Sequence, residues 1–493
     1  MATGLAPAAS VSDVLKELSV KENDVQKPWE RPPLSASYAA KPCIKFQKID
    51  IAESSYDLGS PEIHLFGITK NGHSILVRVV GYEHYAYYLV PKGFSKDDLE
   101  PLRNNLNELI VESYEEVSSA PISRIDLEKG KGELSYLKIM VSDYHDLDEH
   151  SKAQIFQLGR CKYRDMFPNP QNPCWTRRYV NAMSWLKLTA KKYKIVPAEN
   201  KISTCQLEVS IHDEHIMLTS GQAEMGPLRI LSFDIETDIP DDRNVFPTAR
   251  NYPIFTIGNR ISTYGRANSD DVQIVFTLGS CSPISGATVV ACEDEAALLL
   301  AWKSFIIEVD PDIVLGHNIT RFDMPFLLGR AIVMEDPYAL PAWNAFDKCP
   351  GYVGRFVLDI YKHASDIGIT GRGRSTLNSL SERFLNDKKE NLSFDKIPGL
   401  QAGTADDRRT LATYCLKDTL LPLHLMNKME CLPIQIKQAR KAHLPLNAMR
   451  ERPSLKDTSQ ICQKRKAEIE GDSNTNYTLD GERALKRQRS DAY

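Results

Sequence analysis

The stretch Ile230–Thr237 reads ILSFDIET and joins a short apolar run to two acidic side chains, Asp234 and Glu236. The apolar run is typical of a buried β-strand, in which alternate side chains share one face. The two acids therefore project together, while Phe233 and Ile235 point into a core. Neighbouring carboxylates repel each other unless a cation lies between them, and Mg²⁺ is bound through carboxylates and water. The pattern makes the pair a candidate metal site, and a strand that simply ends in solvated acids is the alternative.

The 493 residues are 42% hydrophobic and 26% charged, with a formal net charge of −4, which indicates a globular chain long enough for about three domains. Because the net charge is close to neutral, any basic surface that binds nucleic acid must be local. None of the ten cysteines forms a C-x-x-C pair. The chain has no secretory signal at its start and no apolar run near the roughly 20 residues of a membrane span. We expect an intracellular protein with free thiols and no membrane partner.

The first part of the chain is expected to contain a tail and one domain. Residues 1–40 mix small residues, charges and prolines, which predicts a disordered tail. Over residues 41–227, strand-like runs such as CIKFQKIDI and HSILVRVVGY are separated by turn signals. A helix is predicted over Lys96–Glu112, with Ser95 as its cap. This order of strands, helix and strands predicts an α+β N-terminal domain.

The stretch Trp175–Ile195 interleaves basic and aromatic side chains, among them Arg177, Tyr179, Trp185 and Lys192. Such a pattern can contact a phosphate backbone and stack bases. It also fits an amphipathic surface segment whose lysines lie along apolar surface with their charged ends in water. The residues alone leave both interpretations open.

A second domain is expected over residues 228–430, because a hairpin run is followed by alternating strand-like and helical patterns. A helix is predicted over Glu293–Val309, and the Asp310-Pro311 pair ends it. The order predicts a mixed-sheet α/β domain. Residues 431–493 are predicted to be partly helical and then a disordered basic tail.

Two later segments contain candidate partners for the acid pair. Asp323 lies at the start of an apolar helix, where a carboxylate also stabilises the helix N-terminus without any metal. Tyr414 and Asp418 are four residues apart in a helical pattern and therefore share one face. A tyrosine hydroxyl beside a carboxylate can orient a water molecule for attack. The alternative is a surface tyrosine that is hydrogen-bonded to an acid one turn away.

Taken in order, LSFDIET, GHNITRFDMPFL and YCLKDTLLPLHL resemble the three exonuclease motifs of family B DNA polymerases of the delta type. The resemblance extends from about Phe46 to Met429 and is weaker in its first part. It implies a ribonuclease-H-like (DnaQ-like) exonuclease domain with a mixed sheet, preceded by the α+β N-terminal domain.

The resemblance also implies a set of metal ligands. Asp234 would bridge two divalent ions, which are expected to be Mg²⁺ with Mn²⁺ as an alternative. Glu236 and Asp418 would complete the site of the ion that activates water, and Asp323 would serve the second ion. Two ions about 3.5 to 4 Å apart stabilise the attacking and the leaving oxygen of an in-line displacement.

The remaining implied roles concern water and DNA. Tyr414 would position the attacking water, and Asn318 with Phe322 would contact the last nucleotides of a single strand. The implied reaction is hydrolysis of the phosphodiester at a DNA 3′ end. A frayed end reaches such a site more cheaply than a paired end, because no duplex has to be melted. This preference is the physical basis of proofreading.

The sequence also departs from the family pattern. His317 replaces a usual tyrosine, and the chain between Arg330 and Gly354 is shorter than the pattern predicts, so a hairpin that helps to separate strands is expected to be missing. No SLYPS or YGDTD palm motif occurs, so no polymerase activity is expected from this chain alone. The clusters QKRKAE and ALKRQR predict nuclear import or DNA backbone contacts, with a solvated tail as the alternative.

These observations predict a nuclear 3′–5′ exodeoxyribonuclease that acts on single-stranded or frayed DNA ends, alone or with a separate polymerase half or replication accessory subunits. The alternative is a non-catalytic fragment of a truncated or divided gene that binds DNA or assembles with that polymerase half.

Overall fold

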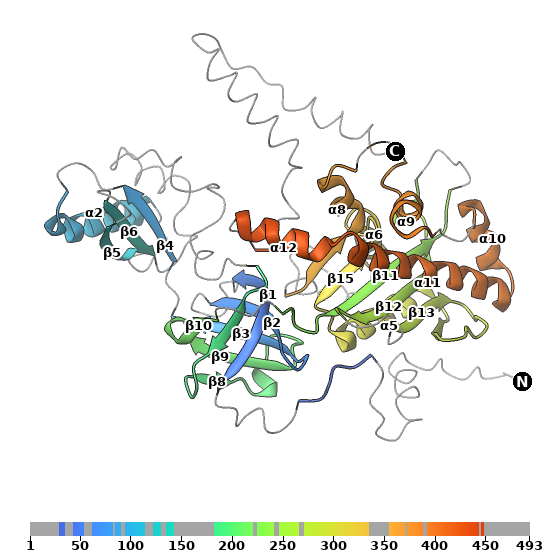
Figure 1. Cartoon of the computed structure of the whole chain (residues 1–493), viewed down its shortest axis with the longest axis horizontal. Coiled ribbons are helices and arrows are strands. Elements are labelled where there is room, and N and C mark those ends of the chain that lie inside the picture. Colours follow the sequence, from blue (N-terminus) through green and yellow to red (C-terminus); the bar gives the residue numbers. More distant parts are fainter. Residues whose placement is uncertain are drawn as a thin grey trace, which may run out of the picture.

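The computed structural model describes residues 29–34, 43–53, 62–81, 84–89, 94–113, 122–129, 135–141, 182–219, 224–240, 246–265, 271–334, 354–369, 371, 373–387, 392–442 and 445–447. Three β-sheets organise these residues (Figure 1). No helix among them is long and apolar enough to cross a membrane.

The predicted strand ILSFDIET forms the middle of a six-stranded sheet with the order β14-β13-β12-β11-β15-β16. β11, β12 and β13 pair antiparallel, whereas β14, β15 and β16 are added in parallel. Three antiparallel strands followed by parallel strands give the mixed, ribonuclease-H-like sheet that the sequence predicts. The strands are β11 (Arg229–Thr237), β12 (Ile254–Thr263), β13 (Val272–Leu278), β14 (Thr288–Cys292), β15 (Ile313–Gly316) and β16 (Phe356–Asp359).

Helices cover both faces of this sheet, and β11 contributes alternate side chains to the two cores. Leu231, Phe233 and Ile235 belong to a core with residues of α5 and α6. Ile230 belongs to the opposite core, which contains residues of α8, α9, α11 and α12. The helices are α5 (Glu295–Val309), α6 (Asp323–Val333), α8 (Ile360–Asp366), α9 (Leu377–Leu385), α10 (Ile397–Ala402), α11 (Ala405–Lys428) and α12 (Cys431–Ala442). A 3₁₀ turn, Phe394–Lys396, precedes α10.

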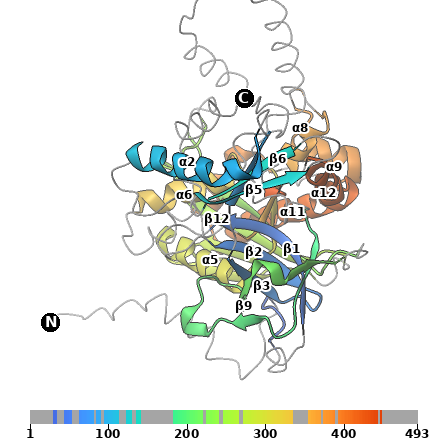
Figure 2. The same cartoon turned by 90° about the vertical axis from the view of Figure 1, so that its left-hand side faces the viewer.

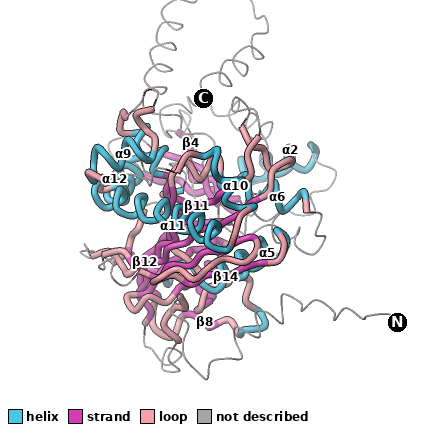
Figure 3. The backbone as a smooth tube through the Cα atoms, turned by 90° about the vertical axis from the view of Figure 1, so that its right-hand side faces the viewer, coloured by secondary structure: helices cyan, strands magenta, loops and turns pink. Residues whose placement is uncertain are grey.

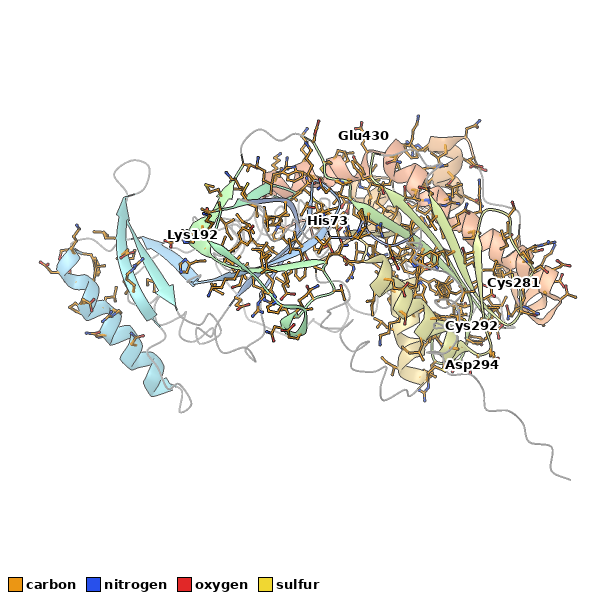
Figure 4. The ribbon with its side chains drawn as sticks, turned by 90° about the horizontal axis from the view of Figure 1, so that it is seen from below. His73, Lys192, Cys281, Cys292, Asp294 and Glu430 are labelled. Carbon is orange, nitrogen blue, oxygen red and sulfur yellow. The ribbon has the colours of Figure 1, made fainter. Side chains whose placement is uncertain are left out.

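The predicted helix after β14 starts at a local cap. The carboxylate of Asp294 accepts a hydrogen bond from the backbone N–H of Ala297 at 2.8 Å, and Cys292 and Asp294 lie close together where β14 leads into α5 (Figure 4). The helix ends at Asp310, whose φ of 45° is left-handed. The predicted stop at Asp310-Pro311 is therefore confirmed.

The region before β11, predicted as an α+β domain, forms two sheets. The larger sheet has the order β10-β7-β1-β2-β3-β9-β8, and the smaller one has the order β4-β6-β5. In Figure 1 the smaller sheet and α2 lie apart from the six-stranded sheet, and Figure 2 shows α2 lying beside β5 and β6. The strands are β1 (Ile44–Glu53), β2 (Ile63–Thr69), β3 (Ser74–Val80), β4 (His84–Leu89), β5 (Ile122–Lys129), β6 (Ser135–Val141), β7 (Trp185–Leu188), β8 (Tyr193–Ile195), β9 (Leu207–His212) and β10 (Ile216–Leu218), with 3₁₀ turns at Ala198–Asn200 and Asp213–His215.

The helix predicted at Lys96–Glu112 is confirmed with its cap. A 3₁₀ turn, Lys96–Asp98, leads into α2 (Leu99–Ser113). Ser95 accepts a hydrogen bond from the backbone N–H of Asp97, and the carboxylate of Asp98 accepts one from the backbone N–H of Ser95 at 2.6 Å. This reciprocal pairing satisfies backbone donors that the start of the helix would otherwise leave unpaired.

The predicted disordered tail is wrong for residues 29–34. Arg31 is 6% exposed, and its guanidinium bonds to the carboxylate of Asp312 at 2.6 Å and to the carbonyl of Gly72 at 2.9 Å. Trp29 packs edge-on against Phe305 of α5, with ring centroids 6.3 Å apart. The segment is held by contacts with residues far away in the sequence, which composition does not reveal. The rest of residues 1–40 lies outside the described residues.

The structure also constrains the basic and aromatic stretch. Trp185 lies on β7, is 6% exposed and donates a hydrogen bond from its indole N–H to the carbonyl of Glu224 at 2.9 Å. A buried indole cannot stack on a base, so the predicted nucleic-acid role is wrong for Trp185. Lys192 is exposed in the turn before β8, whereas Arg177 and Tyr179 lie outside the described residues.

Candidate active site

The two acids of β11 occupy the sheet face that α11 covers. Asp234 is half-buried and Glu236 is 7% exposed. Figure 3 shows α11 beside β11 and β12, and α11 packs on both strands. One ligand atom each from Asp234, Glu236 and Cys415 lie within 4.8 Å of one another. The structure therefore joins the predicted acid pair to a side chain from the third predicted segment.

A glycine on β12 allows α11 to come this close. A Cβ at Gly258 would lie 2.8 Å from Sγ of Cys415 and 3.1 Å from the backbone C and O of the same residue. Contacts this short do not occur in folded proteins without a shift of the neighbouring atoms. Gly258 thus determines how closely the helix carrying Tyr414, Cys415 and Asp418 approaches the acids of β11.

The thiol of Cys415 links both central strands to the helix. Its Sγ accepts a hydrogen bond from the backbone N–H of Gly258 at 3.2 Å. The same Sγ lies 3.4 Å from the carbonyl oxygen of Asp234 and 3.8 Å from its Oδ2. Sequence reasoning missed this residue, although its place between Tyr414 and Asp418 in a helical pattern was a usable signal.

Electrostatics keep this thiol neutral and show which acids surround it. Complete burial raises the pKa of Cys415 well above its usual value, and the carboxylates of Asp234, Glu236 and Asp418 raise that pKa further. All three acids therefore lie within electrostatic range of this one sulfur atom. The neutral S–H can donate to the carbonyl of Asp234, so Cys415 holds the strand in place and is a poor ligand for a hard cation.

Asp323 joins the same group through the backbone of β11. It is the first residue of α6 and is 3% exposed. Its Oδ1 accepts a hydrogen bond from the backbone N–H of Ile235, between Asp234 and Glu236, at 3.1 Å. Helix capping was the alternative explanation for this acid. The observed bond instead connects the start of α6 to the strand that carries the acid pair.

Tyr414 and Asp418 lie one turn apart on α11. Tyr414 is half-buried, and Asp418 is 2% exposed. The helix begins with a capping box in which Thr404 and Asp407 bond reciprocally, so its first turn is fixed locally. Tyr414 is thus partly exposed next to Cys415 on α11, and Asp418 is buried one turn further along the same helix.

Asn318 and Phe322 lie in the turn between β15 and α6. The φ of Asn318 is 64°, a left-handed conformation that asparagine tolerates better than most residues. The ring of Phe322 lies 5.3 Å from that of Phe326 and 5.3 Å from that of Phe246, measured between centroids. Phe246, which is 54% exposed, was not singled out from the sequence.

The donor set suits hard divalent cations. Four carboxylates, from β11, α6 and α11, lie around the strand segment Asp234–Glu236, and carboxylates are the protein ligands that Mg²⁺ and Mn²⁺ prefer. Repulsion among these acids also favours binding of a cation. The predicted metal ligands therefore fit the predicted ions.

The fold is that of a ribonuclease-H-like domain, and comparison with known proteins agrees. The family model described as "DNA polymerase family B, exonuclease domain" matches residues 176–343. Residues 176–343 therefore resemble the exonuclease domain of family B DNA polymerases. Tyr414 and Asp418 lie beyond the matched residues.

More specifically, the chain is similar to catalytic subunits of DNA polymerase delta. It is 33% identical to that of Candida albicans, over 93% of this chain and 45% of the relative. It is 31% identical to that of Schizosaccharomyces pombe, over 92% of this chain and 44% of the relative. The chain thus spans less than half the length of these relatives and corresponds to their N-terminal and exonuclease portion.

A solved structure supports the fold. The family B DNA polymerase from the hyperthermophilic archaeon Pyrobaculum calidifontis superimposes with a TM-score of 0.57 at 19% identity, covering 82% of this chain and 48% of that one. At this identity the similarity concerns the fold alone, and it agrees with the mixed α/β architecture described above.

Proposed function

We propose that this chain is a 3′–5′ exodeoxyribonuclease of the proofreading type that trims single-stranded or frayed DNA ends. The main support is the group formed by Asp234, Glu236 and the thiol of Cys415, whose ligand atoms lie within 4.8 Å of one another. Asp323 is bonded to the strand between the two acids, and Asp418 lies within electrostatic range of the same thiol. The family match and the delta-type relatives support the same class of reaction.

In this proposal the four carboxylates hold two divalent ions, Mg²⁺ or Mn²⁺. When bound, such ions supply an activated water and stabilise charge on the leaving oxygen. The protein's own contribution is preorganisation: Gly258 and Cys415 hold α11 against β11, and the bond from Ile235 holds Asp323 in place.

The DNA end and the attacking water are assigned to neighbouring residues. Tyr414, one residue before Cys415 on α11, orients the water. Asn318 and Phe322, in the turn after β15, hold the last nucleotides of the strand. The ring of Phe322 is already packed between two other phenylalanines, so it offers a stacking face with little loss of side-chain freedom on binding.

The partners follow from the same comparison. The relatives are named as catalytic subunits, so we propose that this chain also associates with a polymerase portion and with replication accessory subunits, and that it acts in the nucleus. The basic clusters that predict nuclear import lie outside the described residues.

The test is digestion of a 5′-labelled single-stranded oligonucleotide by the full chain in the presence of Mg²⁺ or Mn²⁺. The expected result is stepwise shortening from the 3′ end, lost in the double variant Asp234→Ala, Glu236→Ala. Shortening that persists in the folded double variant would disprove the site. Binding of the oligonucleotide without any turnover by the wild-type chain would instead support the non-catalytic alternative.

A further inference from the structure

The turn that carries Asn318 is held by one buried carboxylate, that of Asp359, which is 5% exposed at the end of β16. Its oxygens accept hydrogen bonds from the backbone N–H groups of Asn318 at 2.8 Å and Thr320 at 3.1 Å, and from the hydroxyl of Thr320 at 2.6 Å. It also accepts one from the backbone N–H of Tyr361 at 2.9 Å. The turn and the first residues of α8 therefore form one rigid unit.

This unit presents a guanidinium on an aromatic ring. Arg321 is exposed, and its Cζ lies over the ring of Tyr361 at 5.6 Å from the centroid. The edge of His317 meets the same ring, with centroids 5.8 Å apart at 89°. Stacking on an aromatic face orders a guanidinium and leaves its N–H groups free to contact an anion.

A second exposed arginine belongs to a glycine-rich turn beside this unit. Nε2 of His317 lies 2.7 Å from the carbonyl oxygen of Ser375, which ties the turn Gly373–Thr376 to the turn of Asn318. Gly373 and the nearby Gly371 have φ values of 77° and 115°, which favour glycine. This backbone presents Arg374 at the surface next to the Asn318 turn.

The two arginines place two positive charges on this surface, although the chain as a whole is slightly acidic. Neither Arg321 nor Arg374 forms an ion pair with a carboxylate of the described residues. The nearby carboxylate of Asp359 is buried and saturated by backbone donors. A purely structural role would give this exposed arginine–tyrosine contact only a small effect on stability.

We propose that Arg321 and Arg374 bind phosphates of the single DNA strand upstream of the nucleotides held at Asn318 and Phe322, and that Tyr361 positions the guanidinium of Arg321 for this contact. The inference rests on the proposed exonuclease function and adds a length requirement to its substrate. A strand that is too short to reach the two arginines should gain nothing from them. A longer strand should be bound more tightly and with a stronger dependence on salt.

The test compares digestion of oligodeoxythymidylates of about three and about 12 nucleotides by the full chain and by the double variant Arg321→Ala, Arg374→Ala. The expected result is a loss of at least about tenfold in kcat/KM on the long strand, mostly through KM, and no change on the short strand. The salt slope of binding to the long strand should fall by about 1.4, because each of the two neutralised phosphates of a single strand accounts for about 0.7 of that slope.

Two further variants separate positioning from general charge. Tyr361→Phe keeps the stacking ring and should behave as the wild type, whereas Tyr361→Ala should lose part of the long-strand preference. Arg124→Ala removes an exposed arginine from β5, in the separate small sheet (Figure 1), and should leave both substrates unaffected.

The outcomes separate this inference from the proposed function. An equal loss on short and long strands, or no loss on either, would overturn the role of the arginines while leaving the nuclease intact. If the wild-type chain digests neither strand, the proposed function fails. In that case binding of the long strand in EDTA, measured by fluorescence anisotropy, still tests the arginines, and an unchanged affinity in the double variant overturns their role.

Discussion

The negative charges of two acid clusters in this molecule are balanced in different ways. Around Asp310 and Asp312 the neighbours are guanidinium groups: Arg31 bonds to both acids, and Arg355 lies 3.3 Å from Asp310. Around the strand segment Asp234–Glu236 the acids gather with each other around a neutral thiol.

The difference separates structure from function. Carboxylates matched by arginines within the chain tie together the segment 29–34, the seven-stranded sheet and the six-stranded sheet. Carboxylates matched mainly with one another form a site that a dissolved cation can complete. The first cluster should therefore control stability, and the second should control metal binding and activity.

The largest expected effect tests the first cluster. Asp312→Ala leaves the guanidinium of Arg31, 3% exposed at its side chain, without its 2.6 Å partner. The expected cost is about 3 to 5 kcal/mol in the free energy of unfolding, because Asp310 alone is then left to balance the buried guanidinium groups of Arg31 and Arg355. Urea unfolding measures it. Asp406→Ala, which breaks the exposed pair with Arg409, is the control and should cost less than about 1 kcal/mol. Equal costs for the two variants would contradict the contrast between the clusters.

The next effect concerns a buried ammonium and its pH dependence. Burial lowers the pKa of Lys48 from 10.5 to about 8, and Arg440 contributes to the lowering while Asp50 opposes it. Between about pH 8 and 10.5 the unfolded chain then binds more protons than the folded chain, so stability should rise with pH, by up to about 3 kcal/mol. Below pH 8 both states hold the proton, and the penalty is fully present.

The measurement is urea unfolding across that pH window in the wild type and in Lys48→Met. The rise assigned to Lys48 is the difference between the two proteins, because buried cysteines such as Cys205, whose pKa is raised to about 12, act in the opposite direction in both. Parallel pH profiles for the two proteins would show that Lys48 titrates normally.

A metal titration tests the second cluster. At a free Mn²⁺ concentration of about 100 times the Kd, binding to the folded state alone should stabilise the wild type by about 2.7 kcal/mol. The double variant Asp234→Ala, Glu236→Ala should lose this gain. An Asp310→Asn variant, altered in the arginine-matched cluster, should keep it. The readout is the Mn²⁺-dependent shift in thermal unfolding, and a full shift in the double variant would place the ion elsewhere.

The smallest effect tests the close approach that forms the acid site. Gly258→Ala forces a Cβ against Cys415 and should cost about 1 to 3 kcal/mol in stability. The affinity for Mn²⁺ should fall as well, because α11 and Asp418 move away from β11. Gly399→Ala on α10, where a Cβ meets open space, is the matched control. It should be neutral or slightly stabilising.

The predictions that held are those with a local physical cause. Alternation along ILSFDIET placed Asp234 and Glu236 on one face because a strand has a period of two. Ser95 marked a helix start because its side chain caps a backbone group within the same turn. Each strand and helix has its own local sequence pattern. The order of these patterns, a hairpin run followed by alternating strands and helices, therefore predicted the mixed sheet.

The features that sequence reasoning missed depend on distant contacts. Nothing near Arg31 indicates that its partners are 279 and 281 residues away. The thiol of Cys415 gained a role only because Gly258, 157 residues away, leaves room for it. The exposed ring of Phe246 contacts the ring of Phe322 only in the folded chain, so no local sequence pattern indicates this contact.

The sequence by itself determined the elements, their order and the chemical types of the site residues, because capping, periodicity and motif spacing act over a few residues. The tertiary structure decided which acids lie close to one another and which form ion pairs with arginines. It also decided that Arg321 and Arg374 lie beside the Asn318 turn. Burial and electrostatic pairing depend on distances in space, and only the folded chain sets those distances.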